Sequence, residues 1–117
     1  MKILIVDDST FMRTILKNIL ASGQYSQAEI LEAATGDEAV AVYNEQHPDL
    51  VLLDIIMPGK DGMTVLREIG PSAKSVVIIS SIDQPQVIEQ AKSLGAKGYI
   101  VKPYDANKVI TTLESIA

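Results

Sequence analysis

Four apolar runs of strand length each end in side chains that can take part in chemistry. These side chains are two adjacent acids, a third acid, a hydroxyl and an amine: Asp7 and Asp8, Asp54, Ser80 and Lys102. Carboxylates with no His or Cys nearby favour a hard cation such as Mg²⁺. A carboxylate can also accept a phosphoryl group covalently. The residue types therefore predict a Mg²⁺-dependent phosphoryl acceptor with Asp54 as the nucleophile.

The remaining groups have roles that suit such a site. Carboxylates about 5 Å apart repel one another by roughly 3 kcal/mol at an effective dielectric constant near 20, so the acids require a cation. The cation would also neutralise charge on an incoming phosphate. Lys102 would place a point charge beside one phosphate oxygen, and Ser80 would donate a hydrogen bond to another.

The hydrophobic pattern predicts the elements that position these residues. Strands are expected over residues 2–6, 28–34, 50–54, 75–80 and 98–101, with the second at an edge. Helices alternate with them. The first is expected to turn an apolar stripe inward (Phe11, Met12, Ile15, Leu16, Ile19 and Leu20) and to stop at Gly23. Thr35 and Glu38 have the spacing of a capping box at the second helix.

This alternation predicts an α/β fold, a doubly wound (βα)5 arrangement around a five-stranded parallel sheet. Five strands suit the flavodoxin-like order 2-1-3-4-5, which places strands one, three, four and five side by side. Ligands of such sheets bind at the carboxyl ends of the strands, where all the reactive residues fall. Their coincidence at one edge is a stronger signal than any one of them.

Length and composition limit the alternatives. The 117 residues suit one domain spanning 1–117. A net charge of −5 and the absence of Trp argue against nucleic acid or an anionic membrane as a partner. No apolar run approaches the roughly 20 residues of a membrane span. The absence of cysteine and of a signal sequence favours a cytoplasmic protein.

Each candidate also has a plainer explanation on its own. Asp7 and Asp8 could cap a helix, and Asp54 could belong to a turn. Ser80 could be a satisfied hydroxyl, and His47, beside a proline, is expected at the surface.

Three segments resemble the response-regulator receiver domains. They are Ile3-Leu4-Ile5-Val6-Asp7-Asp8-Ser9, the stretch from Asp49 to Gly62 around Asp54-Ile55-Ile56-Met57-Pro58-Gly59, and Gly95-Ala96-Lys97-Gly98-Tyr99-Ile100-Val101-Lys102-Pro103-Tyr104. The resemblance covers the whole chain, and Ser9-Thr10-Phe11-Met12-Arg13 is more weakly similar to the stand-alone chemotaxis members. Since 2-1-3-4-5 is the known strand order of this family, the resemblance and the predicted order are not independent.

The resemblance implies a signalling protein, not an enzyme, that takes a phosphoryl group from a sensor histidine kinase onto Asp54. It implies Mg²⁺ held by Asp8, Asp54 and the backbone carbonyl of Ile56, with Asp7 reached through water. Lys102 would contact the phosphate, and the peptide bond between Lys102 and Pro103 is expected to be cis.

The resemblance also implies a switch and an output face. Ser80 would swing towards the phosphate and Tyr99 would follow it inward, altering a face made of the fourth helix, fifth strand and fifth helix. With no effector domain expected after residue 117, the output would be protein binding by a monomer, such as binding to a flagellar motor switch protein in chemotaxis. Ile56 and Ile82 replace side chains that are often polar in the family, and we expect them to slow hydrolysis of the acyl phosphate.

Other functions remain open at this point. Within the family, the chain could be a phosphorelay intermediate or a receiver cut from a longer regulator. A small Mg²⁺-dependent phosphatase of the haloacid dehalogenase type would need a second acid where Ile56 stands. A flavodoxin-like cofactor binder would meet the repulsion of Asp7 and Asp8. A receiver-like module that is never phosphorylated would not need the intact set of reactive residues.

Overall fold

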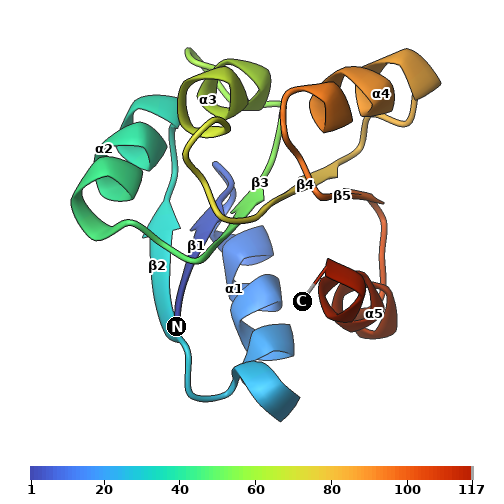
Figure 1. Ribbon diagram of the computed structural model, residues 1–117. Helices are drawn as coiled ribbons and strands as arrows, with labels where there is room; N and C mark the ends of the chain where they lie inside the picture. The colour runs from blue at the N-terminus through green and yellow to red at the C-terminus, as the bar shows by residue number, and fades with distance from the viewer. Residues whose placement is uncertain (117) are drawn as a thin grey trace.

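A parallel sheet with helices on both faces forms the molecule in the computed structural model, which describes residues 1–116 (Figure 1). The strands are β1 (Lys2–Val6), β2 (Glu29–Ala33), β3 (Leu50–Leu53), β4 (Val76–Ser80) and β5 (Gly98–Val101). The helices are α1 (Thr10–Leu20), α2 (Gly36–Gln46), α3 (Gly62–Ile69), α4 (Pro85–Ser93) and α5 (Ala106–Ile116), with a short 3₁₀ turn at Gly23–Tyr25. The sheet order is β2-β1-β3-β4-β5, which confirms the predicted fold and strand order.

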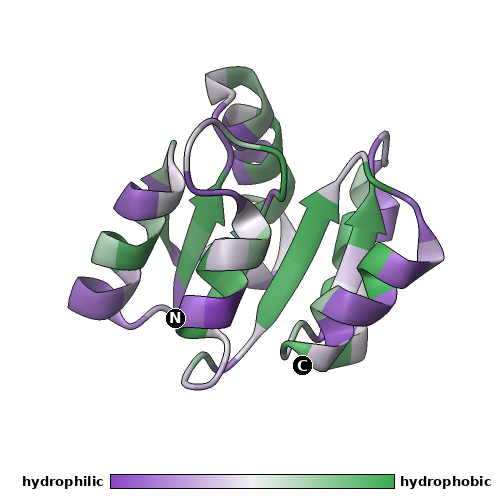
Figure 2. Ribbon diagram, turned by 90° about the horizontal axis from the view of Figure 1, so that it is seen from above, coloured by the Kyte–Doolittle hydropathy of each residue, from purple (hydrophilic) through white to green (hydrophobic). Residues whose placement is uncertain are grey.

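Two apolar layers cover the two faces of the sheet. Because side chains alternate along a strand, Ile3 and Ile5 of β1 pack with α1 and α5, whereas Leu4 and Val6 pack with α2 and α3. Figure 2 shows hydrophobic strands lying between helices that carry both hydrophilic and hydrophobic residues. The apolar runs read from the sequence are therefore strands buried on both sides.

Strand register brings the predicted site residues to one edge. Val6 lies opposite Leu53, so Asp7 and Asp54 follow neighbouring strands at the same level. The Asp54 amide donates to the Val6 carbonyl at 3.0 Å. On the other side, the Lys102 amide donates to the Ser80 carbonyl at 2.8 Å. Main-chain pairing thus fixes the relative positions of β1, β3, β4 and β5 at their carboxyl ends.

Three local predictions differ from the structure. Phe11 is 72% exposed instead of inward: it lies in the first turn of α1, whereas the buried residues of this helix, Leu16 and Leu20, lie in its second half. The helix ends at Leu20, and Gly23, with φ of 73°, begins the 3₁₀ turn instead. Thr35 does cap α2 through the Glu38 amide, but the Glu38 carboxylate accepts from Ala34 and not from Thr35.

Candidate phosphoryl-acceptor site

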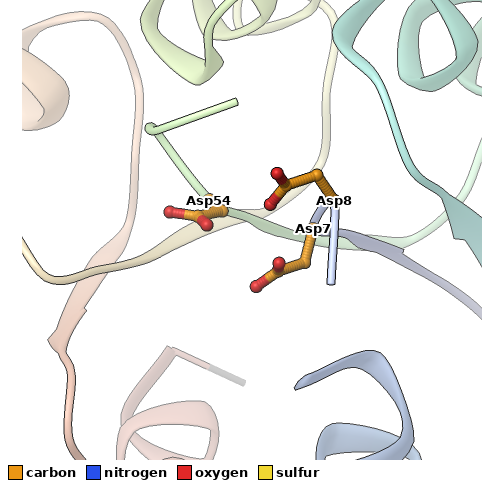
Figure 3. A group of neighbouring side chains, drawn as sticks. All are labelled: Asp7, Asp8 and Asp54. Carbon is orange, nitrogen blue, oxygen red and sulfur yellow. The ribbon is translucent and has the colours of Figure 1, made fainter. Parts of the chain in front are cut away.

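Three carboxylates converge at the carboxyl end of β1 and β3. Asp7, Asp8 and Asp54 each offer an oxygen, and these oxygens lie within 4.8 Å of one another. Figure 3 shows the three side chains pointing into a shared space. Asp7 and Asp54 are buried, while Asp8 is exposed. The predicted acid cluster is therefore present, with one member open to solvent.

Lys102 joins the two buried acids. Its ammonium nitrogen lies 3.0 Å from Asp7 Oδ2 and 3.2 Å from Asp54 Oδ2. Burial opposes the charge on Lys102, but its bond with Asp7 and the field of Asp54 outweigh that effect and raise its pKa. The peptide bond to Pro103 is cis, as the family resemblance implied.

The electrostatics of Asp54 differ from those of an ordinary surface acid. Burial raises the pKa of Asp54, and repulsion by Asp7 adds to this, while Lys102 acts in the opposite direction. The other carboxylate oxygen accepts from the Ile56 amide at 3.3 Å. Asp54 is thus fixed on both sides, with Lys102 on one oxygen and the loop after β3 on the other.

Hydrogen bonds hold the Asp7 carboxylate as well, but not that of Asp8. The Ser9 amide donates to Asp7 Oδ1 at 2.9 Å, and Lys102 takes the other oxygen. Within residues 1–116, no protein group donates a hydrogen bond to the Asp8 carboxylate. Asp8 is therefore the acid best placed to bind a cation from solvent.

Ser80 and Tyr99 meet at the loop between β4 and α4. The buried Ser80 hydroxyl accepts a hydrogen bond from the Ile82 amide at 3.2 Å. The Tyr99 hydroxyl donates to the Ile82 carbonyl at 2.7 Å. Both side chains are therefore tied to the same residue of this loop, Ser80 to its amide and Tyr99 to its carbonyl.

Ile56 and Ile82 lie on the two loops beside the acids. The Ile56 side chain is 55% exposed, one of the few large apolar side chains at the surface of the described residues. Ile82 is half-buried and packs against the apolar layer beneath α2 and α3. Each isoleucine therefore stands in the loop that follows a strand, two residues after Asp54 or Ser80.

Sequence reasoning missed two residues that support the site. Gly62 packs directly under Asp54, because a Cβ atom there would lie 2.1 Å from the Asp54 carbonyl oxygen. Arg13 donates to the Asp7 carbonyl oxygen at 2.5 Å. Gly62 was expected in a loop but begins α3, and only the close approach of two backbones reveals its role. The position of Arg13 in the second turn of a helix next to the acids was the available signal.

The fold and the acid–lysine cluster together define a receiver domain. The family model for the response regulator receiver domain matches residues 3–114. The chain belongs to that family.

Named relatives are similar over nearly the whole chain. The chemotaxis protein CheY of Listeria monocytogenes is 44% identical over 120 residues, covering 100% of this chain and 98% of that protein. CheY of Thermotoga maritima is 41% identical, covering 99% and 97%. These relatives fit a role in chemotaxis.

Solved structures agree in fold. The CheX–CheY–BeF3–Mg²⁺ complex from Borrelia burgdorferi contains a chain with a TM-score of 0.89 and 38% identity, covering 98% of this chain and 87% of that one. The response regulator domain of Thermotoga maritima CheB gives a TM-score of 0.84 at 32% identity, covering 99% and 92%. Among residues 1–116, no helix has the length and apolar character to cross a bilayer.

Proposed function

We propose that the chain is a phosphorylation-controlled response regulator in chemotaxis signalling, with Asp54 as the phosphoryl acceptor. The observation that supports this most is the placement of three acids and Lys102 at one edge of the sheet. In this proposal the donor is a phosphohistidine on a sensor histidine kinase of the CheA type. The relatives named CheY support this assignment.

The residues present fit Mg²⁺, which receiver domains bind at an acidic pocket. All candidate ligands are hard oxygens, and Asp8 is both exposed and without a protein donor. Asp8, Asp54 and the Ile56 carbonyl would hold the ion, with Asp7 reached through water. When bound, Mg²⁺ would neutralise charge on the phosphoryl group and the acids. The solved complex that contains CheY, BeF3 and Mg²⁺ supports this choice of metal.

The chain's own groups account for the transfer step. An Asp54 carboxylate oxygen attacks phosphorus, a P–O bond forms, and the P–N bond to the donor imidazole breaks with its electron pair going to nitrogen. Lys102 already lies 3.2 Å from an Asp54 oxygen and would stabilise negative charge on the phosphoryl group. The Ile56 amide would keep the other Asp54 oxygen in place.

The signal would leave the site through Ser80 and Tyr99. A Ser80 hydroxyl that turns to the phosphoryl group must leave the Ile82 amide, and Tyr99 is bonded to the carbonyl of that same residue. Helix α4, next to this loop, has only Ala91 fully buried, so few contacts resist its movement. The α4-β5-α5 face would then bind an output protein such as a flagellar motor switch component.

A mass measurement tests the acceptor assignment. The protein is incubated with a small-molecule phosphodonor, with and without Mg²⁺, beside an Asp54→Asn variant. We expect one added phosphoryl group that requires both Mg²⁺ and Asp54. Rapid release of phosphate without an adduct would indicate a phosphatase instead. A protein that neither gains nor releases phosphate would be an interaction module.

Ile56 and Ile82 would set the lifetime of the phosphorylated state. Their apolar side chains would exclude the water that hydrolyses the acyl phosphate. Replacing Ile82 with Glu, or Ile56 with Asn, should therefore speed the loss of phosphate after the donor is removed. Ile82→Leu is the matched control and should leave the decay rate nearly unchanged. If the polar variants decay at the wild-type rate, the isoleucines do not control hydrolysis.

A further inference from the structure

Arg13 makes a set of contacts that the proposed function does not use. It lies on α1, and its side chain is only 13% exposed. One guanidinium nitrogen donates to the Asp7 carbonyl oxygen at 2.5 Å, and Nε donates to Glu32 on β2 at 2.9 Å. A third contact reaches the Thr10 hydroxyl at 3.2 Å. Arg13 thus ties a helix, the edge strand and the end of β1 together.

The carbonyl that Arg13 binds belongs to the peptide unit between Asp7 and Asp8. Because that unit is planar, fixing its oxygen also fixes the direction in which the chain enters Asp8. On the other side of Asp7, its amide donates to the Ala33 carbonyl at 3.1 Å. The carboxylate of Asp8 has no protein donor within the described residues. Arg13 is therefore a direct constraint on the position of Asp8.

Glu32 explains why the guanidinium does not pair with the acid cluster instead. Its two carboxylate oxygens accept from Arg13 at 2.9 Å and from Lys17 at 3.0 Å. The hydrogen bond from Lys17 lowers the pKa of Glu32 most, and the bond from Arg13 lowers it further. Both bonds favour the ionised carboxylate. Glu32 therefore holds the guanidinium towards β2, where it can reach the Asp7 carbonyl without neutralising the carboxylates.

We propose that Arg13 is a positioning residue for the metal site, and that it orients the peptide between Asp7 and Asp8 while Glu32 holds its charge away from the acids. The inference rests on the proposed binding of Mg²⁺ by these acids. Under this inference α1, through Arg13, and the edge strand β2, through Glu32, help to set the affinity for Mg²⁺.

Positioning and simple electrostatics predict opposite effects for the same substitution. Arg13→Met removes a positive charge near three carboxylates, and Coulomb's law alone would then make Mg²⁺ bind more tightly. Loss of the constraint on Asp8 would make Mg²⁺ bind more weakly. Lys17→Met is a matched control, because it removes the same charge and a partner of the same Glu32 without touching Asp7.

The experiment is calorimetric titration of the unphosphorylated proteins with Mg²⁺, with folding checked by circular dichroism. We expect Arg13→Met to weaken Mg²⁺ affinity about tenfold, as is typical when a group that holds a metal ligand is removed. Lys17→Met should bind as tightly as the wild type or slightly more tightly. Arg13→Lys keeps the charge and is the variant to use if Arg13→Met does not fold. It should also lose affinity, because an ammonium lacks the fork that spans both partners.

The outcomes separate the two proposals. Wild-type affinity, or tighter binding, in a folded Arg13→Met or Arg13→Lys protein would overturn the positioning role and leave the proposed function standing. An equal loss in Lys17→Met would also overturn it, since the loss would then follow from disturbing Glu32 and not from losing the bond between Arg13 and the Asp7 carbonyl. Failure of the wild type to bind Mg²⁺ would overturn the proposed function itself, and this inference with it.

Discussion

Replacing Lys102 with Met should destabilise the metal-free protein. The substitution keeps most of the apolar stem but removes the ammonium that lies 3.0 Å from Asp7 and 3.2 Å from Asp54. Two buried carboxylates would then face each other with oxygens no more than 4.8 Å apart. At an effective dielectric constant near 20, that repulsion is worth about 3 kcal/mol. Breaking a buried ion pair at one partner commonly costs about 3–5 kcal/mol, which agrees.

Urea unfolding in Mg²⁺-free buffer measures this cost. With an m-value of about 1.5 kcal/mol/M, a loss of about 3 kcal/mol lowers the unfolding midpoint by about 2 M. Lys74→Met is the matched control, because Lys74 pairs with Asp49 but its side chain is 76% exposed. Its loss should cost less than about 1 kcal/mol.

The pH dependence of this loss has a defined sign. The pKa of Lys102 is raised, so the stabilisation that its ammonium provides persists through neutral pH and disappears only above its ordinary value of 10.5. Burial raises the pKa of Asp54, so this carboxylate becomes protonated first as the pH falls, and the cost of Lys102→Met should shrink. Added Mg²⁺ should also reduce it, since the ion replaces the missing charge. Equal losses for the Lys102 and Lys74 variants, or no response to pH, would refute the reasoning.

Four further substitutions test the packing and charge around the site. Tyr104→Phe should raise the free energy of unfolding by about 1 kcal/mol, because the Tyr104 hydroxyl is buried without a hydrogen-bond partner among the described residues. Thermal or urea unfolding that shows a less stable variant would contradict this. Gly62→Ala should cost about 3 kcal/mol and reduce Mg²⁺-dependent phosphorylation, since its Cβ would lie 2.1 Å from the Asp54 carbonyl oxygen. Gly59→Ala, where φ is 75° but the space is open, should cost only about 1–2 kcal/mol and leave phosphorylation intact. In Mg²⁺-free buffer Asp54→Asn should be more stable than the wild type at neutral pH. Burial raises the Asp54 pKa, so the folded protein favours the protonated acid, and the stability that this gives is lost as the pH rises above 3.8. That advantage should vanish in unfolding curves recorded below the ordinary pKa, and an advantage that instead grows on acidification would contradict the assignment.

The sequence contained enough information for the sheet and for the residues at its edge. Apolar runs such as Leu50–Leu53 identify buried strands, and the order of a doubly wound sheet places Asp7, Asp54 and Lys102 together. The strands follow from the local pattern alone. The strand order does not, because 2-1-3-4-5 is also the known order of the family that the chain resembles, so the two sources are not independent.

Contacts that depend on side-chain direction could not be predicted in the same way. The bonds from Arg13 to Asp7 and from Tyr99 to Ile82 join residues whose orientation is set by the packing of whole elements. Phe11 had helical spacing in the apolar stripe, yet it is 72% exposed, and only Leu16 and Leu20 of α1 are buried. Periodicity gives the face of a helix but not how far the neighbouring layer extends.

Chemical trapping of the phosphorylated residue tests the central claim most directly. After incubation with a phosphodonor and Mg²⁺, borohydride reduces an aspartyl phosphate to homoserine, and peptide mass spectrometry locates the change. We predict homoserine at position 54 and at neither Asp7 nor Asp8, with none formed when Mg²⁺ is omitted. Conversion at another acid, or formation of a phosphoserine at Ser80 in its place, would contradict the assignment of Asp54 as the acceptor.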